Sequence, residues 1–197
     1  ALVSKLSNLN HELTLFTRGI QPVPNNVDHF LGDRKNPDDL KQLSNNTFEV
    51  IIDTSGRTLE DTKNVLEIVG LPKFRFLYIS SAGIYKKSDV FPIKENSSID
   101  INSRHIGKHH TEQWILKQKI PFTSFRPTYI YGPGNYNPIE RWFFDRIINK
   151  KIVPIPGDGS TITQLGHVQD LVNAMTLSLN NRQSENKIYN CSGKQGV

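Results

Sequence analysis

The chain has 197 residues with a formal net charge of +5, and 36% of its residues are hydrophobic. This length suffices for one sizeable core, and the composition is typical of a globular protein. No apolar run approaches the roughly 20 residues that a membrane-spanning helix needs, and the first residues do not resemble a signal peptide. The single cysteine, Cys191, excludes an internal disulfide and is predicted to be a small buried hydrophobe near a strand end. We therefore expect neither a membrane partner nor a disulfide scaffold.

The positive charge is concentrated in the second half of the chain. Residues 1–100 hold 12 Lys/Arg against 13 Asp/Glu, whereas residues 101–197 hold 12 against 6. A polyanion partner for the second half would bind through phosphate contacts and counterion release. The alternative is a solvated basic surface without a specific partner.

Hydrophobic periodicity and turn residues divide the chain into alternating helices and strands. Asn36 with Pro37 starts one predicted helix, and Gly70 with Pro72 ends another. Predicted helices cover residues 1–10, 37–43, 59–69, 103–119, 139–149 and a stretch from 168, and predicted strands cover residues 11–19, 29–32, 48–52, 76–80, 121–125 and 187–190. This alternation predicts an α/β fold with a doubly wound parallel sheet.

The first predicted element is a helix, whereas a βαβ unit begins with a strand and a glycine-rich turn. We therefore expect residues 1–197 to form a single Rossmann-like domain, truncated at both ends. Its first strand and phosphate-binding glycine loop would be missing. Strict alternation stops near Gly132, so residues 132–166 are expected to form part of a smaller lobe on the substrate side.

Residues 76–108 hold the main candidate site. The strand at 76–80 is followed by Ser81, and Lys108 lies in the helix predicted to open near Ser103. Ligands of open α/β sheets meet side chains at the carboxyl ends of strands, so Ser81 and Lys108 are expected to converge there. Arg104 stands four residues before Lys108 and is predicted to share its helix face.

Several motifs resemble those of the short-chain dehydrogenase/reductase superfamily, in its extended or atypical branch, which includes nucleotide-sugar epimerases. They are Gly32-Asp33, Asp53 to Gly56, Ser80 to Tyr85, Lys108, Arg126-Pro127, Tyr131 to Pro133, Pro156 to Gly159 and His167 to Asp170. More narrowly, SSAGIYKKSD, SRHIGK, RPTYIYGPGNYNP, RWFFDRI, VPIPGDGS and QLGHVQDL are similar to the chloroplast stem-loop-binding proteins and their cyanobacterial relatives.

The narrower resemblance implies an RNA-binding protein that takes stem-loop transcripts or ribosomal RNA. It also implies association with ribosomal assemblies, a homo- or hetero-oligomer, and a chloroplast stroma or cyanobacterial cytoplasm. Some members of that family cleave stem-loops, so a metal-assisted endoribonuclease activity with Mg²⁺ is a further expectation. The alternatives are an NAD(P)-dependent nucleotide-sugar epimerase or dehydratase, and a non-catalytic scaffold linked to ribosomes.

Redox chemistry in the superfamily uses a Tyr-x-x-x-Lys pair with a nearby serine. A phenol has a pKa near 10, which a lysine one turn away lowers by favouring the phenolate. By resemblance, Ser81 and Lys108 match the ancestral catalytic serine and lysine, but Arg104 stands at the tyrosine position. A guanidinium remains protonated and cannot serve as the acid or base, so hydride transfer by the usual mechanism is not expected. Tyr85 is the nearest tyrosine in sequence, on the strand-end motif.

A cation in place of a phenol favours anions such as phosphates. The predicted RNA-binding residues are Arg104, His105, Lys108, His109, Arg141 and Arg146. Lys108 has a competing role on a ribose hydroxyl. His105 and His109 have a metal-compatible spacing, but without a third ligand we predict no metal site there. The aromatic residues Tyr129, Tyr131, Tyr136, Trp142, Phe143 and Phe144 are predicted either to stack on unpaired bases or to form the core of the lobe.

The cofactor-binding residues that the resemblance implies are Thr17, Arg18, Asp33, Asp53, Ser55, Lys108 and Pro127. Arg18 lies where an acidic residue would accept ribose hydroxyls, and its charge favours the 2′-phosphate of NADP over NAD. The alternative is that Arg18 is a solvated loop residue. Asp53 has a second interpretation as the cap of the helix near Leu59. Any dinucleotide binding is expected to be vestigial.

Overall fold

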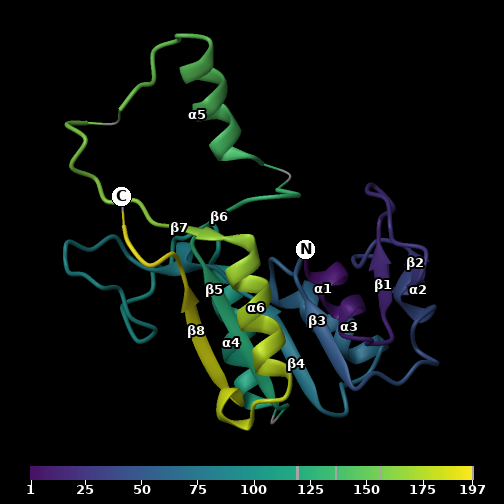
Figure 1. Cartoon of the computed structure of the whole chain (residues 1–197). Helices are drawn as coiled ribbons and strands as arrows, with labels where there is room; N and C mark the ends of the chain where they lie inside the picture. Colours follow the sequence, from purple (N-terminus) through teal and green to yellow (C-terminus); the bar gives the residue numbers. More distant parts are fainter. Residues whose placement is uncertain (119, 136, 156, 197) are drawn as a thin grey trace.

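The computed structural model describes residues 1–118, 120–135, 137–155 and 157–196 (Figure 1). Tyr136 and Pro156 of the predicted motifs, and Lys119 at a predicted helix end, lie outside these ranges. The elements are α1 (Leu2–Asn8), β1 (Thr14–Thr17), β2 (Asp28–Leu31), α2 (Pro37–Lys41), β3 (Val50–Asp53), α3 (Leu59–Ile68), β4 (Arg75–Ile79), the 3₁₀ turn η1 (Ala82–Ile84), α4 (Ile106–Lys117), β5 (Phe122–Pro127), β6 (Tyr129–Tyr131), α5 (Ile139–Ile148), β7 (Leu165–His167), α6 (Val168–Leu179), the 3₁₀ turn η2 (Arg182–Ser184) and β8 (Lys187–Cys191).

The described strands pair in parallel throughout. The larger sheet has the order β3-β4-β5-β8, and β1 pairs with β2 while β6 pairs with β7. Figure 1 shows β1, β2 and α2 at one side of the molecule, next to β3. Because the four strands of the larger sheet run parallel, their carboxyl ends lie at the same edge of the sheet.

Helices cover both faces of the larger sheet. On one face, Phe76 and Tyr78 of β4 pack with Leu66 of α3 and Ile115 of α4. On the other face, Leu77 packs with residues of α1 and α6, including Leu6 and Met175. This division follows from strand geometry, because successive side chains point to opposite faces. The predicted doubly wound α/β fold is confirmed.

Helix α4 begins later than the sequence pattern predicts. The hydroxyl of Ser103 donates to the carbonyl of Gly83 and accepts from the backbone N–H of His105. This side-chain turn competes with helix formation, and α4 starts only at Ile106. The prediction that Arg104 and Lys108 share a helix face is therefore wrong. Arg104 lies in the turn before α4, and His105 is the residue at the helix cap.

The segment after β5 leaves the main body before returning as α6. Figure 1 shows α5 on a long excursion away from the sheets, and none of the α5 residues is buried. Trp142, Phe143 and Phe144 are 43%, 42% and 61% exposed, so they do not form a core within the described residues. Whether residues 132–166 act as a substrate-side lobe remains a prediction.

Candidate functional site

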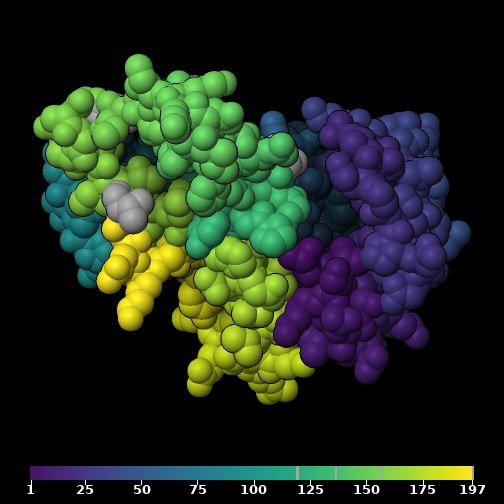
Figure 2. Space-filling view, turned by 45° about the horizontal axis from the view of Figure 1, so that its top comes forward, coloured from purple at the N-terminus to yellow at the C-terminus, as the bar shows by residue number. Residues whose placement is uncertain are grey.

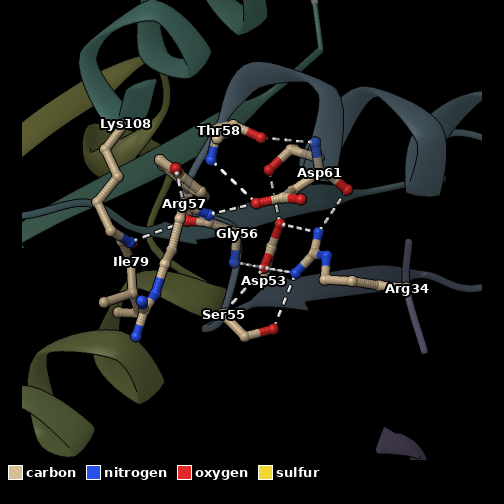
Figure 3. A network of polar contacts seen from close by, with 11 residues as sticks. Arg34, Asp53, Ser55, Gly56, Arg57, Thr58, Asp61, Ile79 and Lys108 are labelled. Atoms are coloured by element: carbon tan, nitrogen blue, oxygen red, sulfur yellow. Dashed lines mark hydrogen bonds and ion pairs between the residues drawn. The ribbon is translucent and has the colours of Figure 1, made fainter. Parts of the chain in front are cut away.

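Lys108 is the centre of the site at the carboxyl ends of β3 and β4. Its ammonium donates to the carbonyls of Gly56, at 3.0 Å, and of Ile79, at 2.5 Å (Figure 3). The ammonium also lies 5.3 Å from the centre of the Tyr78 ring. The residue is only 9% exposed, and this burial lowers the pKa of Lys108 to about 8. The lysine is thus fixed by the protein's own backbone.

Asp53, at the end of β3, forms the anionic part of the same network. Its carboxylate receives both terminal nitrogens of Arg34, at 2.6 and 2.7 Å, and the hydroxyl of Thr62 at 2.7 Å. The backbone N–H of Gly56 donates to it as well, and Figure 3 shows these bonds converging. Burial favours a raised pKa, but Arg34 and the other donors hold the pKa of Asp53 below its ordinary value.

The alternative that Asp53 caps the following helix is not what the structure shows. Thr58 is the cap of α3, and its hydroxyl accepts from the backbone N–H of Asp61. The Asp61 carboxylate in turn accepts from the N–H groups of Arg57 and Thr58. This reciprocal capping box holds the loop between β3 and α3 in place.

Arg104 and His105 form the exposed side of the site. The Nε atom of Arg104 donates to Nε2 of His105 at 3.0 Å, and Arg104 is otherwise exposed. His105 lies against Gly83, where an added Cβ would be 2.7 Å from its Cδ2 atom. Partial burial, followed by the charges of Arg104, Lys108 and Arg57, lowers the pKa of His105. The imidazole is therefore neutral at pH 7.

Arg57 is a member of this site that the sequence analysis did not single out. A Cβ built on Gly107 would lie 2.5 Å from the Arg57 carbonyl, so the loop before α3 touches the first turn of α4. The Arg57 side chain is exposed, and Figure 3 shows no hydrogen bond to its guanidinium from the residues drawn. Its position directly after the Asp53–Gly56 motif was the one available signal.

Comparison with known proteins shows the family to which the chain belongs. Residues 1–192 match the NAD dependent epimerase/dehydratase family. The chain belongs to that family. Solved structures agree with its fold: an epimerase from Methanothermobacter thermautotrophicus matches with a TM-score of 0.85 at 20% identity, over 100% of this chain and 68% of that one. The UDP-glucose 4-epimerase of Thermus thermophilus, in complex with NAD, matches with a TM-score of 0.81 at 18% identity, over 100% and 74%.

A curated relative from a plant carries a different name. The chloroplast stem-loop binding protein of 41 kDa b from Arabidopsis thaliana is 42% identical over 204 residues, which are 95% of this chain and 53% of that protein. The resemblance to the stem-loop-binding proteins is thereby confirmed. The chain spans about half the length of this relative.

The residues at the strand ends do not fit the nicotinamide chemistry that the epimerase/dehydratase family name implies. By the resemblance, Arg104 stands where the superfamily has its tyrosine. Lys108 is bonded to two carbonyls, and Ser81 accepts from the backbone N–H of Gly83. Tyr85 does not substitute for the missing tyrosine, because its hydroxyl donates to Asn190 and accepts from Arg126. We derive no hydride-transfer step from this arrangement.

A buried ion pair also fixes the position of α4 on the larger sheet. Glu112 of α4 is fully buried and accepts from Arg126 of β5, with a shortest distance of 2.7 Å, and from Ser124. Arg126 further donates to the carbonyl of Glu95. His109 faces the same carboxylate, at 3.7 Å. His109 therefore points toward this buried pair.

The predicted cofactor residues are distributed over three places. Thr17 bonds His29 at 2.8 Å, the exposed Arg18 follows it at the end of β1, and Asp33 accepts from the backbone N–H of Lys35. Asp53 and Ser55 both bind Arg34. Pro127 instead lines a separate cavity of about 230 Å³, together with Ile130, Gly166, His167, Asp170, Leu171, Ala174, Asn190, Cys191 and Ser192.

The two predicted RNA-binding residues on α5 lie on the excursion after β5. Arg141 forms an exposed ion pair with Asp145 at 3.5 Å. Arg146 lies over the Trp142 ring at 4.7 Å and donates to the carbonyl of Ile152. Figure 2 shows a hollow between the green part of the chain, which includes α5, and the blue-purple part of its first half.

Metal and membrane sites have no structural support in the described ranges. No group of three or more His, Cys, Asp or Glu side chains there is placed to hold a metal ion. None of the helices within those ranges is long and apolar enough to cross a membrane.

Proposed function

We propose that this chain binds structured RNA, with the exposed residues before α4 contacting the phosphate backbone. The observation that supports this proposal best is the exposed guanidinium of Arg104 at the superfamily's tyrosine position. It is bonded to His105, on which the charge of Arg57 also acts. Guanidinium groups form strong, charge-assisted bonds to phosphate oxygens. The basic second half of the chain and the similarity to the Arabidopsis stem-loop binding protein support the same proposal.

The predicted RNA-binding residues enter this proposal with different roles. Arg104 and His105 are available for direct phosphate contact, and Arg141 and Arg146 supply further positive charge on α5. Lys108 contributes its charge from beneath, because its ammonium is already bonded to two carbonyls. The alternative role of Lys108, a contact with a ribose hydroxyl, would require its ammonium to give up a bond to one of these carbonyls. His109 faces Glu112 and is the weakest of the predicted contacts.

Salt-dependent binding tests the proposal. Fluorescence anisotropy with a labelled stem-loop RNA should show an affinity that falls as salt rises, and Arg104→Gln should weaken binding about fivefold and reduce the salt slope by about one. Arg182→Gln is the matched control, because Arg182 lies in η2 at the amino end of β8, away from the strand ends of the site. Absence of RNA binding at low salt would reject the proposal.

Cleavage of the bound RNA is a finer part of the proposal and is tested separately. A metal-assisted endoribonuclease should cut a stem-loop RNA in the presence of Mg²⁺ and stop when EDTA is added. Binding without cleavage would instead favour the scaffold, as part of a ribosome-linked assembly and as a homo- or hetero-oligomer. A chloroplast stroma or a cyanobacterial cytoplasm is the compartment that the proposal implies.

A second candidate, binding of NADP, is favoured by Arg18. This exposed cation follows β1, where the superfamily recognises the adenosine ribose, and a 2′-phosphate would pair with it. The measurement is the fluorescence of NADPH titrated with the protein. We expect weak binding that Arg18→Gln lowers by about fivefold, because a single charge-assisted contact is lost. Equal affinity for NADH and NADPH would reject this role of Arg18.

A further inference from the structure

Three cationic residues and one imidazole meet where the loop after β3 touches the start of α4. The backbone contact between Arg57 and Gly107 brings the loop against the helix, although about 50 residues separate them in sequence. Arg57 and Arg104 are exposed, His105 is partly buried, and Lys108 lies beneath them. The charges of Arg57, Arg104 and Lys108 all act on His105.

We propose that Arg57, Arg104 and His105 form one phosphate-binding site in which His105 takes up a proton from solvent as the phosphate group binds. The source of the phosphate rests on the proposed RNA function, but the site itself does not. Lys108 supports the site through its charge. Its hydrogen bonds to Gly56 and Ile79 keep it from being a direct ligand.

The charge balance of the cluster is the first argument for an anion. Like charges held together repel one another, and a bound anion removes that repulsion. The nearest carboxylates are already used: Asp53 holds Arg34 and Thr62, and Asp61 holds the loop backbone. From η1, which packs against His105 through Gly83, no titratable side chain faces the imidazole. The described charges that act on His105 are thus all positive.

The hydrogen-bond donors give the second argument. Since Nε–H of Arg104 donates to Nε2 of His105, the proton of the neutral imidazole lies on Nδ1. Within the described residues, no side-chain bond engages the terminal nitrogens of Arg104, the guanidinium of Arg57 or Nδ1 of His105. A phosphate has oxygens for several such donors at once.

His105 takes up a proton because a bound phosphate replaces the repulsion between the imidazolium and the neighbouring cations by an attraction. In the absence of an anion, three neighbouring cations disfavour the imidazolium. A phosphate group next to the ring reverses the sign of the local field and favours the charged form. The incoming proton binds Nε2, so Arg104 Nε–H is released from that atom and turns to the phosphate. Binding therefore becomes tighter as the pH falls through the range in which His105 titrates.

The experiment uses sulfate as the probe, because it remains a dianion over the working pH range and all proton uptake then belongs to the protein. NMR of the histidine ring protons in the whole chain should show saturable shifts at His105, with its titration midpoint raised by about one pH unit in saturating sulfate. Affinity for sulfate should be about fivefold tighter at pH 5.5 than at pH 7.5. Arg57→Gln and His105→Gln should each reduce it, and only His105→Gln should remove the pH dependence.

His110→Gln provides the matched control, since His110 is exposed on α4 but outside the cluster. Thermal melting of each variant shows that it is folded. The proposal is overturned if sulfate leaves His105 unmoved, or if all histidines shift alike without saturation.

Competition then identifies the source of the phosphate and separates this inference from the proposed function. Stem-loop RNA that displaces sulfate from His105 supports both. RNA that binds without moving the His105 signals supports the proposed function and overturns the site. Displacement by NADP but not by RNA supports the site and assigns its phosphate to a dinucleotide, which contradicts the RNA proposal.

Discussion

The loop from Asp53 to Thr58 separates two charged regions with opposite organisation. On its inner side, Asp53 is buried and meets Arg34 through two short bonds. On its outer side, Arg57 lies with Arg104 and His105, and the described charges around that imidazole are of one sign. Buried charges are tolerated when paired, whereas uncompensated cations at a surface favour an anionic ligand. The inner region therefore serves stability, and the proposed role of the outer region is binding.

Breaking the inner ion pair should have the largest effect on folding. Asp53→Asn leaves the Arg34 guanidinium without its charge partner, and we expect the free energy of unfolding to fall by about 3 kcal/mol. Denaturant unfolding measures this. Asp38→Asn, which breaks an exposed ion pair with Lys41, is the control and should leave stability nearly unchanged. Similar losses in both variants would contradict the distinction between the two regions.

The pH dependence of stability should reveal the buried ammonium of Lys108. Its pKa is about 8 in the folded protein and about 10.4 in the unfolded chain, so the unfolded state binds more protons between these values. Stability should consequently rise with pH in that window, by about 2 kcal/mol. Unfolding of the wild type and Lys108→Met at pH 7.5 and 9.5 isolates the effect. An equal pH dependence in the two proteins would show that Lys108 is not the group responsible.

The smallest effect is expected where the outer region meets η1. In Gly83→Ala, the added Cβ meets the His105 ring, whose side chain must shift. Because this ring is only partly buried and can move toward solvent, the free energy of unfolding should fall by only about 0.5 kcal/mol. The sulfate affinity should nevertheless decrease about threefold, since the imidazole is displaced from the cluster. Unchanged affinity in a folded variant would contradict the role of His105 as a ligand.

The sequence predicts much of the fold, because its helices and strands have clear periodicities and end signals. It also predicts that Lys108 lies at the strand ends and that Arg104 replaces the acid. It does not predict that α4 begins at Ile106, since the delay depends on a bond from Ser103 to the distant Gly83. The sequence does not identify Arg57 for a similar reason, because its contact with Gly107 forms only when the loop and the helix pack together.

The ion pair between Arg34 and Asp53 shows the same limit. Asp53 stands in a motif that resembles a cofactor-binding segment, and Arg34 directly follows the Gly32-Asp33 motif. Their separate positions in the sequence give no sign that they form an ion pair. Only the folded chain shows that this carboxylate is fully engaged. Residue types and spacing therefore identify the part of the chain that holds the site. Which charged side chains form ion pairs, and which are left to bind a ligand, depends on tertiary contacts.

Crosslinking of a stem-loop RNA to the protein, followed by peptide mapping, tests the central claim most directly. The account predicts crosslinked peptides that contain Arg57 and the Arg104–His105 segment, with the yield falling as salt rises. Crosslinks confined to other surfaces, such as the peptide around Arg182 in η2, would contradict it.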